Sequence, residues 1–142
     1  MTDEESHLAK LFGTHGLGVL ATIKRDGRPQ LSNVAYAYDA AARTLSVSVT
    51  DSRAKTRNLR RDPRASMYVT SANRWAYAVA EGSAELTPVT TDPEDATAEA
   101  LVQLYRSVSG EHPDWAEFRA AMVDELRLVL RVRVQRFYGV AG

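Results

Sequence analysis

The alternation of hydrophobic and polar residues along the chain predicts six β-strands. From residue 45 to residue 50, Leu45, Val47 and Val49 alternate with hydroxyl-bearing residues, as in a strand with one buried face. Five other segments show a similar alternation or an apolar run, and Asp26 followed by Gly27 predicts a tight hairpin turn between the first two. The predicted strands are residues 17–23, 30–38, 45–50, 65–70, 75–87 and 126–137.

A helical spacing of apolar residues predicts four helices. Leu8, Leu11 and Phe12 fall on one side of a short N-terminal helix, and Pro63 ends the second helix. The predicted helices are residues 3–12, 52–62, 92–109 and 113–125. No helix separates the first three strands, which argues against a βαβ arrangement. We therefore expect a mainly β protein with added helices: a closed or nearly closed six-stranded antiparallel barrel that forms one domain, residues 1–142, with a helical insertion at about 92–125.

The amino-acid composition excludes several classes of function but does not identify one. The chain has 142 residues, 18 basic and 18 acidic side chains, and no cysteine. Balanced charge gives no reason to expect nucleic-acid binding, and the lack of cysteine excludes disulfides, cysteine nucleophiles and thiolate metal sites. Three scattered histidines do not predict a metal site. No apolar run approaches the roughly 20 residues of a membrane span, and the polar start is no signal peptide, so we expect a cytoplasmic protein without a membrane partner.

Basic residues are concentrated between residues 53 and 64, where six of them stand against one acidic residue. Arg53, Lys55 and Arg57 fall in the first turns of the predicted second helix. The N-terminus of a helix already carries partial positive charge, so this arrangement is unfavourable unless an anion is bound. Two interpretations stay open: a phosphate site at the end of the third strand, or a solvated basic helix face.

Two further groups of residues are candidates for ligand contacts. Gln30, Ser32 and Asn33 are polar in an otherwise apolar strand, which suits either hydrogen bonding to a polar ring or an edge position after the hairpin. Trp75 and Tyr77 are two residues apart and would share a strand face, which suits either an aromatic wall for a planar ligand or a core or dimer interface. The pattern alone favours the second interpretation in both cases. Motifs for Ser-His-Asp catalysis, for Walker A and for dinucleotide binding are absent.

Four collinear segments resemble the pyridoxamine-phosphate-oxidase-like split β-barrel flavoproteins. The resemblance is closer to their actinobacterial branch, which uses the deazaflavin coenzyme F420. The segments are residues 18–33, 53–66, 75–82 and 104–112. The resemblance extends from about residue 11 to residue 138 and implies a six-stranded, FMN-binding-like split barrel. It also implies a homodimer with two cofactor sites across the subunit interface.

The resemblance implies three groups of cofactor-binding residues. The group for the cofactor phosphate is Arg53, Lys55, Thr56 and Arg57. The group beside the tricyclic ring is Pro29, Gln30, Leu31, Ser32, Ser48, Val49 and Thr50. The residues that one subunit would bring over the ring of the other are Trp75 and Tyr77. Arg53, Arg57 and Lys24 are also expected to reach an oligoglutamate tail.

The expected chemistry follows from the cofactor. Reduced F420 donates hydride, so the resemblance implies reduction of a planar, conjugated small molecule such as a quinone, an enone or a tetrapyrrole. The proton would come from solvent, or from Tyr77 or Tyr36. Three alternatives stay open: FMN as the cofactor for oxidase or reductase chemistry, a carrier or sensor that binds F420 without turnover, and a structural dimeric barrel whose basic helix contacts another protein.

Overall fold

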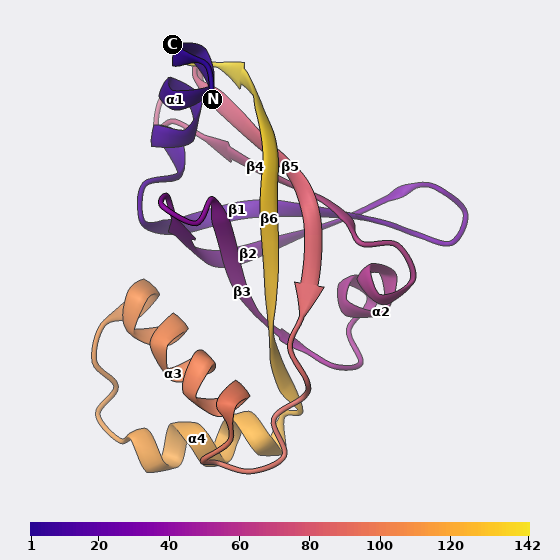
Figure 1. The fold of residues 1–142 in the computed structure, drawn as a ribbon, viewed down its shortest axis with the longest axis vertical. Coiled ribbons are helices and arrows are strands. Elements are labelled where there is room, and N and C mark those ends of the chain that lie inside the picture. The colour runs from indigo at the N-terminus through magenta and orange to yellow at the C-terminus, as the bar shows by residue number, and fades with distance from the viewer.

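Six antiparallel strands close into a barrel in the order β1-β2-β3-β6-β5-β4, which confirms the predicted fold class. The computed structural model describes residues 1–142. The strands are β1 (His15–Ile23), β2 (Pro29–Asp39), β3 (Thr44–Thr50), β4 (Arg64–Thr70), β5 (Tyr77–Leu86) and β6 (Arg127–Val140). The helices are α1 (Asp3–Ala9), the 3₁₀ turn η1 (Lys10–Phe12), α2 (Ala54–Arg61), α3 (Ala96–Ser109) and α4 (Trp115–Asp124). Figure 1 shows α1 at one end, the α3–α4 pair at the other and α2 beside the projecting β1–β2 hairpin. None of these helices combines the length and the apolarity that crossing a membrane requires.

Large apolar side chains fill the barrel interior. Leu20, Leu45, Met67 and Leu130 come from four different strands and are completely buried there. Phe12 of η1 joins the same cluster, so α1 and η1 close one end of the barrel. Burial of this cluster, rather than local strand propensity, is the main stabilising contribution to the fold.

Small residues occupy the inward positions of β5. Ala78 and Ala80 are completely buried, and the β5–β6 ladder shifts register between Glu81 and Gly82. A Cβ atom on Gly82 would overlap the backbone carbonyl group of Arg133 on β6. The glycine therefore permits the close approach with which β6 joins the barrel.

Helices α3 and α4 connect β5 to β6 and cover part of the outer face of the sheet. Leu101 and Leu104 of α3 and Phe118 of α4 form a second apolar cluster with Val129 of β6. Val129 is buried although it lies next to inward-facing Leu128 and Leu130, because the helices cover the opposite face of the strand.

Helix α3 begins at Ala96, later than the predicted residue 92, because Asp95 caps it. The Asp95 carboxylate accepts hydrogen bonds from the backbone N–H groups of Thr91, Asp92 and Ala98. These bonds hold the segment before the helix in a turn. Aspartate is among the preferred N-cap residues for this reason.

Replacing Asp95 by alanine is expected to destabilise the protein by about 1 kcal/mol, the usual effect of losing an N-cap. Although burial alone would raise the pKa of Asp95, the surrounding hydrogen bonds lower that pKa to about 2. The stabilisation is therefore fully present above the ordinary aspartate range and is lost as the pH falls towards 2. Urea unfolding of wild type and Asp95→Ala at about pH 7 and about pH 3 should give a smaller difference at acid pH. An equal difference at both pH values would contradict a role for the ionised carboxylate.

The predicted start of the fifth strand is wrong, and the difference places an aromatic residue outside the strand. β5 begins at Tyr77, so Trp75 lies in the preceding turn and does not share a strand face with Tyr77. The Asn73 side chain accepts a hydrogen bond from the Trp75 backbone N–H (3.0 Å), and Arg74 adopts a φ of 66°. These local hydrogen bonds compete with strand pairing, which the alternation of residue types did not reveal.

Candidate functional site

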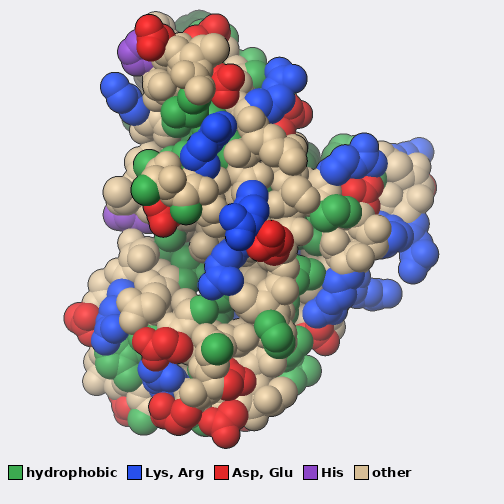
Figure 2. Space-filling model, in the orientation of Figure 1, with side chains coloured by type: hydrophobic (Ala, Val, Ile, Leu, Met, Phe, Trp, Pro, Cys, Tyr) green, Lys and Arg blue, Asp and Glu red, His purple; other side chains and the backbone are tan.

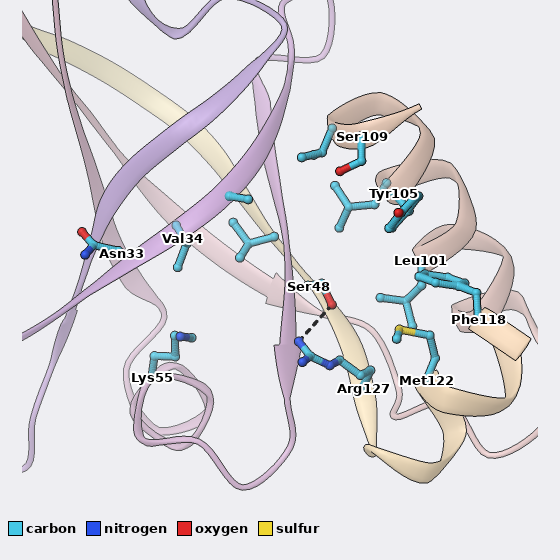
Figure 3. Close-up of a pocket in the computed structure, with 14 residues that line it drawn as sticks. Asn33, Val34, Ser48, Lys55, Leu101, Tyr105, Ser109, Phe118, Met122 and Arg127 are labelled. Carbon is cyan, nitrogen blue, oxygen red and sulfur yellow. Dashed lines mark hydrogen bonds between the residues drawn. The ribbon is translucent and has the colours of Figure 1, made fainter. Parts of the chain in front are cut away.

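A pocket of about 420 Å³ lies between the outer face of β2 and β3 and the α3–α4 pair (Figure 3). We call it the covered pocket. Nine of its fourteen lining residues are hydrophobic, and none is acidic. Its two charged residues, Lys55 and Arg127, are both cations. Such a pocket suits a ligand with an apolar body and an anionic group.

Lys55 enters the covered pocket from the first turn of α2, which is held against the end of β3. The Thr56 hydroxyl and the Arg53 backbone N–H both donate to the Thr50 carbonyl oxygen, at 2.8 and 3.2 Å. Lys55 is half-buried and makes no ion pair. Burial, and then the charges of Arg53 and Arg127, lower the pKa of Lys55. An anion in the pocket would relieve this repulsion and stabilise the charged lysine.

Arg127 is the second cation of the covered pocket and begins β6. It reaches the site because β6 pairs with β3, with Arg127 directly opposite Thr50. Its guanidinium donates to the Ser48 hydroxyl oxygen (3.4 Å), the contact drawn in Figure 3, and pairs with the Glu125 carboxylate (3.0 Å). Since Arg127 pairs with Glu125, Lys55 is the cation of this pocket that has no ion-pair partner.

The α3–α4 pair supplies the apolar wall of the covered pocket. Leu101, Tyr105 and Met122 extend from these helices towards the sheet (Figure 3). The rings of Tyr105 and Phe118 pack edge to face with centroids 5.1 Å apart, and Trp115 packs against Tyr105 at 5.7 Å. Mutual aromatic packing holds the wall in one arrangement.

A buried hydrogen-bonded group fixes α2 to the base of the β1–β2 hairpin. The Asn58 amide donates to the Thr22 hydroxyl oxygen (3.1 Å), and Thr22 donates to the Gln30 side-chain oxygen (3.3 Å). Arg61 donates to the Asn58 side-chain oxygen (3.0 Å) and to the Ile23 carbonyl oxygen (2.7 Å). These bonds set the position of α2, and therefore of Lys55.

A second recess, of about 550 Å³, lies between the β1–β2 hairpin and another side of α2. We call it the basic cleft, because its lining contains five basic side chains and no acidic one. The five are Lys24, Arg25, Arg57, Arg60 and Arg61. Figure 2 shows basic side chains gathered on this side of the molecule. The basic segment predicted from the sequence thus borders two recesses, one on each of two sides of α2.

The structure separates the four residues of the expected phosphate group. Only Lys55 lines the covered pocket. Thr56 is completely buried and its hydroxyl is bonded to backbone, so its side chain is not available to a ligand. Arg57 lines the basic cleft together with Lys24, while Arg53 is exposed at the N-cap of α2.

Strand alternation also divides the expected ring group. On β3, Ser48 lines the covered pocket, but Val49 points into the barrel core and is 1% exposed. Thr50 contributes the carbonyl oxygen that holds α2. The Val49 side chain therefore does not face the covered pocket, since consecutive strand residues point to opposite faces.

On β2, the covered pocket is lined by Asn33, one of the polar residues singled out from the sequence, and by Val34 and Ala35. The four β2 residues that the resemblance implies come before these three. The predicted four were Pro29, Gln30, Leu31 and Ser32. Gln30 lines the basic cleft, and the Ser32 hydroxyl oxygen is buried without a hydrogen-bond partner. Pro29 and Leu31 are exposed. The hairpin carries these residues away from the α3–α4 pair.

The three expected aromatic residues lie outside the covered pocket within one chain. Trp75 is 81% exposed, and the Tyr77 ring stacks on Tyr68 with centroids 5.8 Å apart. Tyr36 is a core residue whose hydroxyl donates to the Phe12 carbonyl oxygen (2.8 Å), and burial raises its pKa to about 12. Tyr36 is therefore excluded as the proton donor for a ligand on the outer face.

Sequence patterns did not identify Arg127 or the α3–α4 wall as parts of the site. Placing Arg127 beside Ser48 requires the β3–β6 register, which no local pattern contains. The helical spacing of Phe118 and Met122 indicated only helix packing, and both do pack in the second apolar cluster. Their second role, as pocket walls, depends on where the helices lie on the sheet.

Comparisons with known proteins identify the family. A family model described as pyridoxamine 5'-phosphate oxidase matches residues 5–141. A solved structure described as an F420 reductase is 25% identical with a TM-score of 0.67, over 97% of this chain and 98% of that one. A heme binding protein from Mycobacterium smegmatis is 25% identical with a TM-score of 0.69, over 100% of this chain and 55% of that one. A conserved hypothetical protein from Mycobacterium tuberculosis, 24% identical with a TM-score of 0.72, shares the fold over 99% of this chain and 84% of that one. The predicted resemblance is confirmed: the chain belongs to the pyridoxamine 5'-phosphate oxidase family.

Proposed function

We propose that this protein is an oxidoreductase that binds coenzyme F420 and transfers hydride from the reduced cofactor to a planar, conjugated small molecule. The observation that carries the proposal is Lys55, a half-buried cation without a counter-charge at a mainly apolar pocket. Similarity to a protein described as an F420 reductase over nearly the whole of both chains supports it.

The residues of the covered pocket fit a flavin-like cofactor. Lys55, assisted by Arg127, would hold the phosphate, because both are cations and no acid lines the pocket. Leu101 and Tyr105 would pack on the apolar ring and exclude water from it, and Asn33 offers hydrogen bonds to its polar edge. The cofactor, when bound, supplies hydride chemistry; the protein binds and orients it.

The basic cleft favours F420 over FMN. F420 carries an oligoglutamate tail beyond its phosphate, whereas FMN ends at the phosphate. Lys24, Arg25 and Arg57 line the cleft without forming ion pairs, so they are free to bind carboxylates.

A fluorescence-quenching titration of the purified protein with F420 and with FMN tests the proposal. We expect tighter binding of F420, and a steeper loss of F420 affinity as salt rises, because screening weakens the contacts of the exposed tail with the cleft. Tighter binding of FMN would move the function to flavin chemistry on the same fold. Binding of neither would contradict a cofactor site.

Two variants make the titration specific. Arg57→Gln should weaken F420 binding and flatten its salt dependence, with little change for FMN. Arg28→Gln is the matched control, because Arg28 is an exposed arginine of the β1–β2 hairpin that pairs with Asp26 and lies outside the cleft. Equal effects of the two variants would argue against a tail site in the cleft.

We also propose that the protein forms a homodimer through the outer face of β1, β4, β5 and β6. Six exposed apolar side chains lie on this face or at its edge. They are Leu17, Leu31, Tyr68, Trp75, Tyr138 and Val140. Val79 pairs with both Tyr68 and Tyr138 across the ladder, so these two tyrosines lie on the same face of the sheet. A second copy of the chain would cover it symmetrically and bring Trp75 near the other subunit's site.

Leu17→Glu is expected to convert the dimer into a folded monomer. Leu17 is 79% exposed, so a charge there opposes association without disturbing the barrel core. Light scattering coupled to size-exclusion chromatography measures the mass. Leu126→Glu is the control, since Leu126 is also exposed but lies between α4 and β6, away from this face. A monomeric wild type, or a dimeric Leu17→Glu variant, would contradict the proposed interface.

A further inference from the structure

A groove of about 670 Å³ continues from the covered pocket along α3, between that helix and the ends of β2 and β3. We call it the α3 groove. Leu104 lines both recesses, so they adjoin. The α3 groove is more polar: Thr14, Ser46, Gln103 and Ser107 offer hydroxyl and amide groups.

Small side chains form a shared floor beneath the two recesses. Ala35 and Ala37 alternate outward on β2, and Ser46 and Ser48 alternate outward on β3, with Ala37 directly opposite Ser46. Because none of these side chains is large, α3 does not close onto the sheet along this line. The floor therefore suits a flat ligand in each recess, and the two ligands would lie next to each other beside Leu104.

Arg131 is the cation of the α3 groove, and it has no partner. It is half-buried and forms no ion pair or side-chain hydrogen bond. Its cross-strand neighbour Glu85 bonds instead to Arg133, at 2.8 Å. The groove's one acidic residue, Asp39, accepts a hydrogen bond from the Ala42 backbone N–H.

We propose that the α3 groove binds the electron acceptor, and that this acceptor is a planar, conjugated acid whose carboxylate is bound by Arg131. A half-buried guanidinium that forms no ion pair is well matched to a carboxylate, which it can bind through two hydrogen bonds. The assignment of the ligand as an acceptor rests on the proposed function of the adjoining pocket; the recognition of a carboxylate by Arg131 does not.

The test compares 2-naphthoate with 2-naphthamide, two planar probes of the same shape that differ in charge. Isothermal titration calorimetry on the wild type, with F420 or FMN already saturating the covered pocket, should show about a tenfold preference for the carboxylate. Arg131→Gln should abolish this preference and leave the affinity for 2-naphthamide unchanged. Arg133→Gln, on the same strand face but paired with Glu85, should keep the preference.

Other outcomes overturn the proposal. No preference in the wild type, or a preference that survives in Arg131→Gln, removes Arg131 as the carboxylate site. In the cofactor-free protein, a preference that disappears in Lys55→Gln and not in Arg131→Gln places the probe in the covered pocket instead. If neither cofactor binds, the proposed function fails, and the same titration on the cofactor-free protein still decides whether Arg131 recognises a carboxylate.

Discussion

Replacing Lys55 by glutamine is expected to weaken cofactor binding by about ten- to a hundredfold, the usual effect of removing a charged hydrogen-bond partner. Lys55 is the cation of the covered pocket that no acid neutralises, so an incoming phosphate gains its full attraction. Fluorescence titration with whichever of F420 and FMN the wild type binds measures the loss. Because the pKa of Lys55 is lowered, wild-type affinity should also begin to fall at a lower alkaline pH than an ordinary lysine would give.

Thermal unfolding distinguishes a loss of cofactor binding in Lys55→Gln from a folding defect. Lys55 is repelled by Arg53 and Arg127 in the free protein, so Lys55→Gln should unfold at a temperature no lower than the wild type. Lys10→Gln, which removes an exposed lysine of η1, should change neither property. Unchanged cofactor affinity in Lys55→Gln would remove Lys55 from the site, and a lower unfolding temperature would make it a structural residue.

Gly82→Ala is expected to destabilise the protein by about 3 kcal/mol, towards the upper end of what overpacking causes. The new methyl group would overlap the backbone carbonyl of Arg133, and backbone in a closed barrel has little room to move. Urea unfolding followed by circular dichroism measures the change in the free energy of unfolding.

The neighbouring position supplies the control for Gly82. Ser83 already has a Cβ atom and donates no side-chain hydrogen bond, so Ser83→Ala should stay within about 0.5 kcal/mol of the wild type. A Gly82→Ala variant as stable as Ser83→Ala would show that β6 adjusts at the register shift, and that the close approach is not required.

The barrel was predictable because its strands have strong periodic patterns. Leu45, Val47 and Val49 alternate cleanly with polar residues and are all buried. Boundaries failed where side chains bond to nearby backbone. Asp95 delays the start of α3, and Asn73 holds Trp75 in a turn.

The candidate site was predictable in part, for a related reason. Lys55 stood out because a cation in the first turn of a helix is unfavourable without a ligand. Arg127 and Arg131 did not stand out, because each matters only through its β3 neighbour, Ser48 for one and Ser46 for the other. Their roles depend on strand register and on the position of α3, and both are set by packing between residues far apart in the chain.

With the proposed ligand bound, the anchoring of α2 to the hairpin would make binding in the two recesses beside it depend on the length of the ligand. Lys55 and Arg57 belong to one short helix that the Asn58 and Arg61 hydrogen bonds fix to β1, so the backbone positions from which the two side chains start do not shift when a ligand binds. A ligand whose negative groups are closer together than this spacing can engage one recess or the other, but not both. Compounds of equal total charge would then differ in affinity according to how far apart their charges lie.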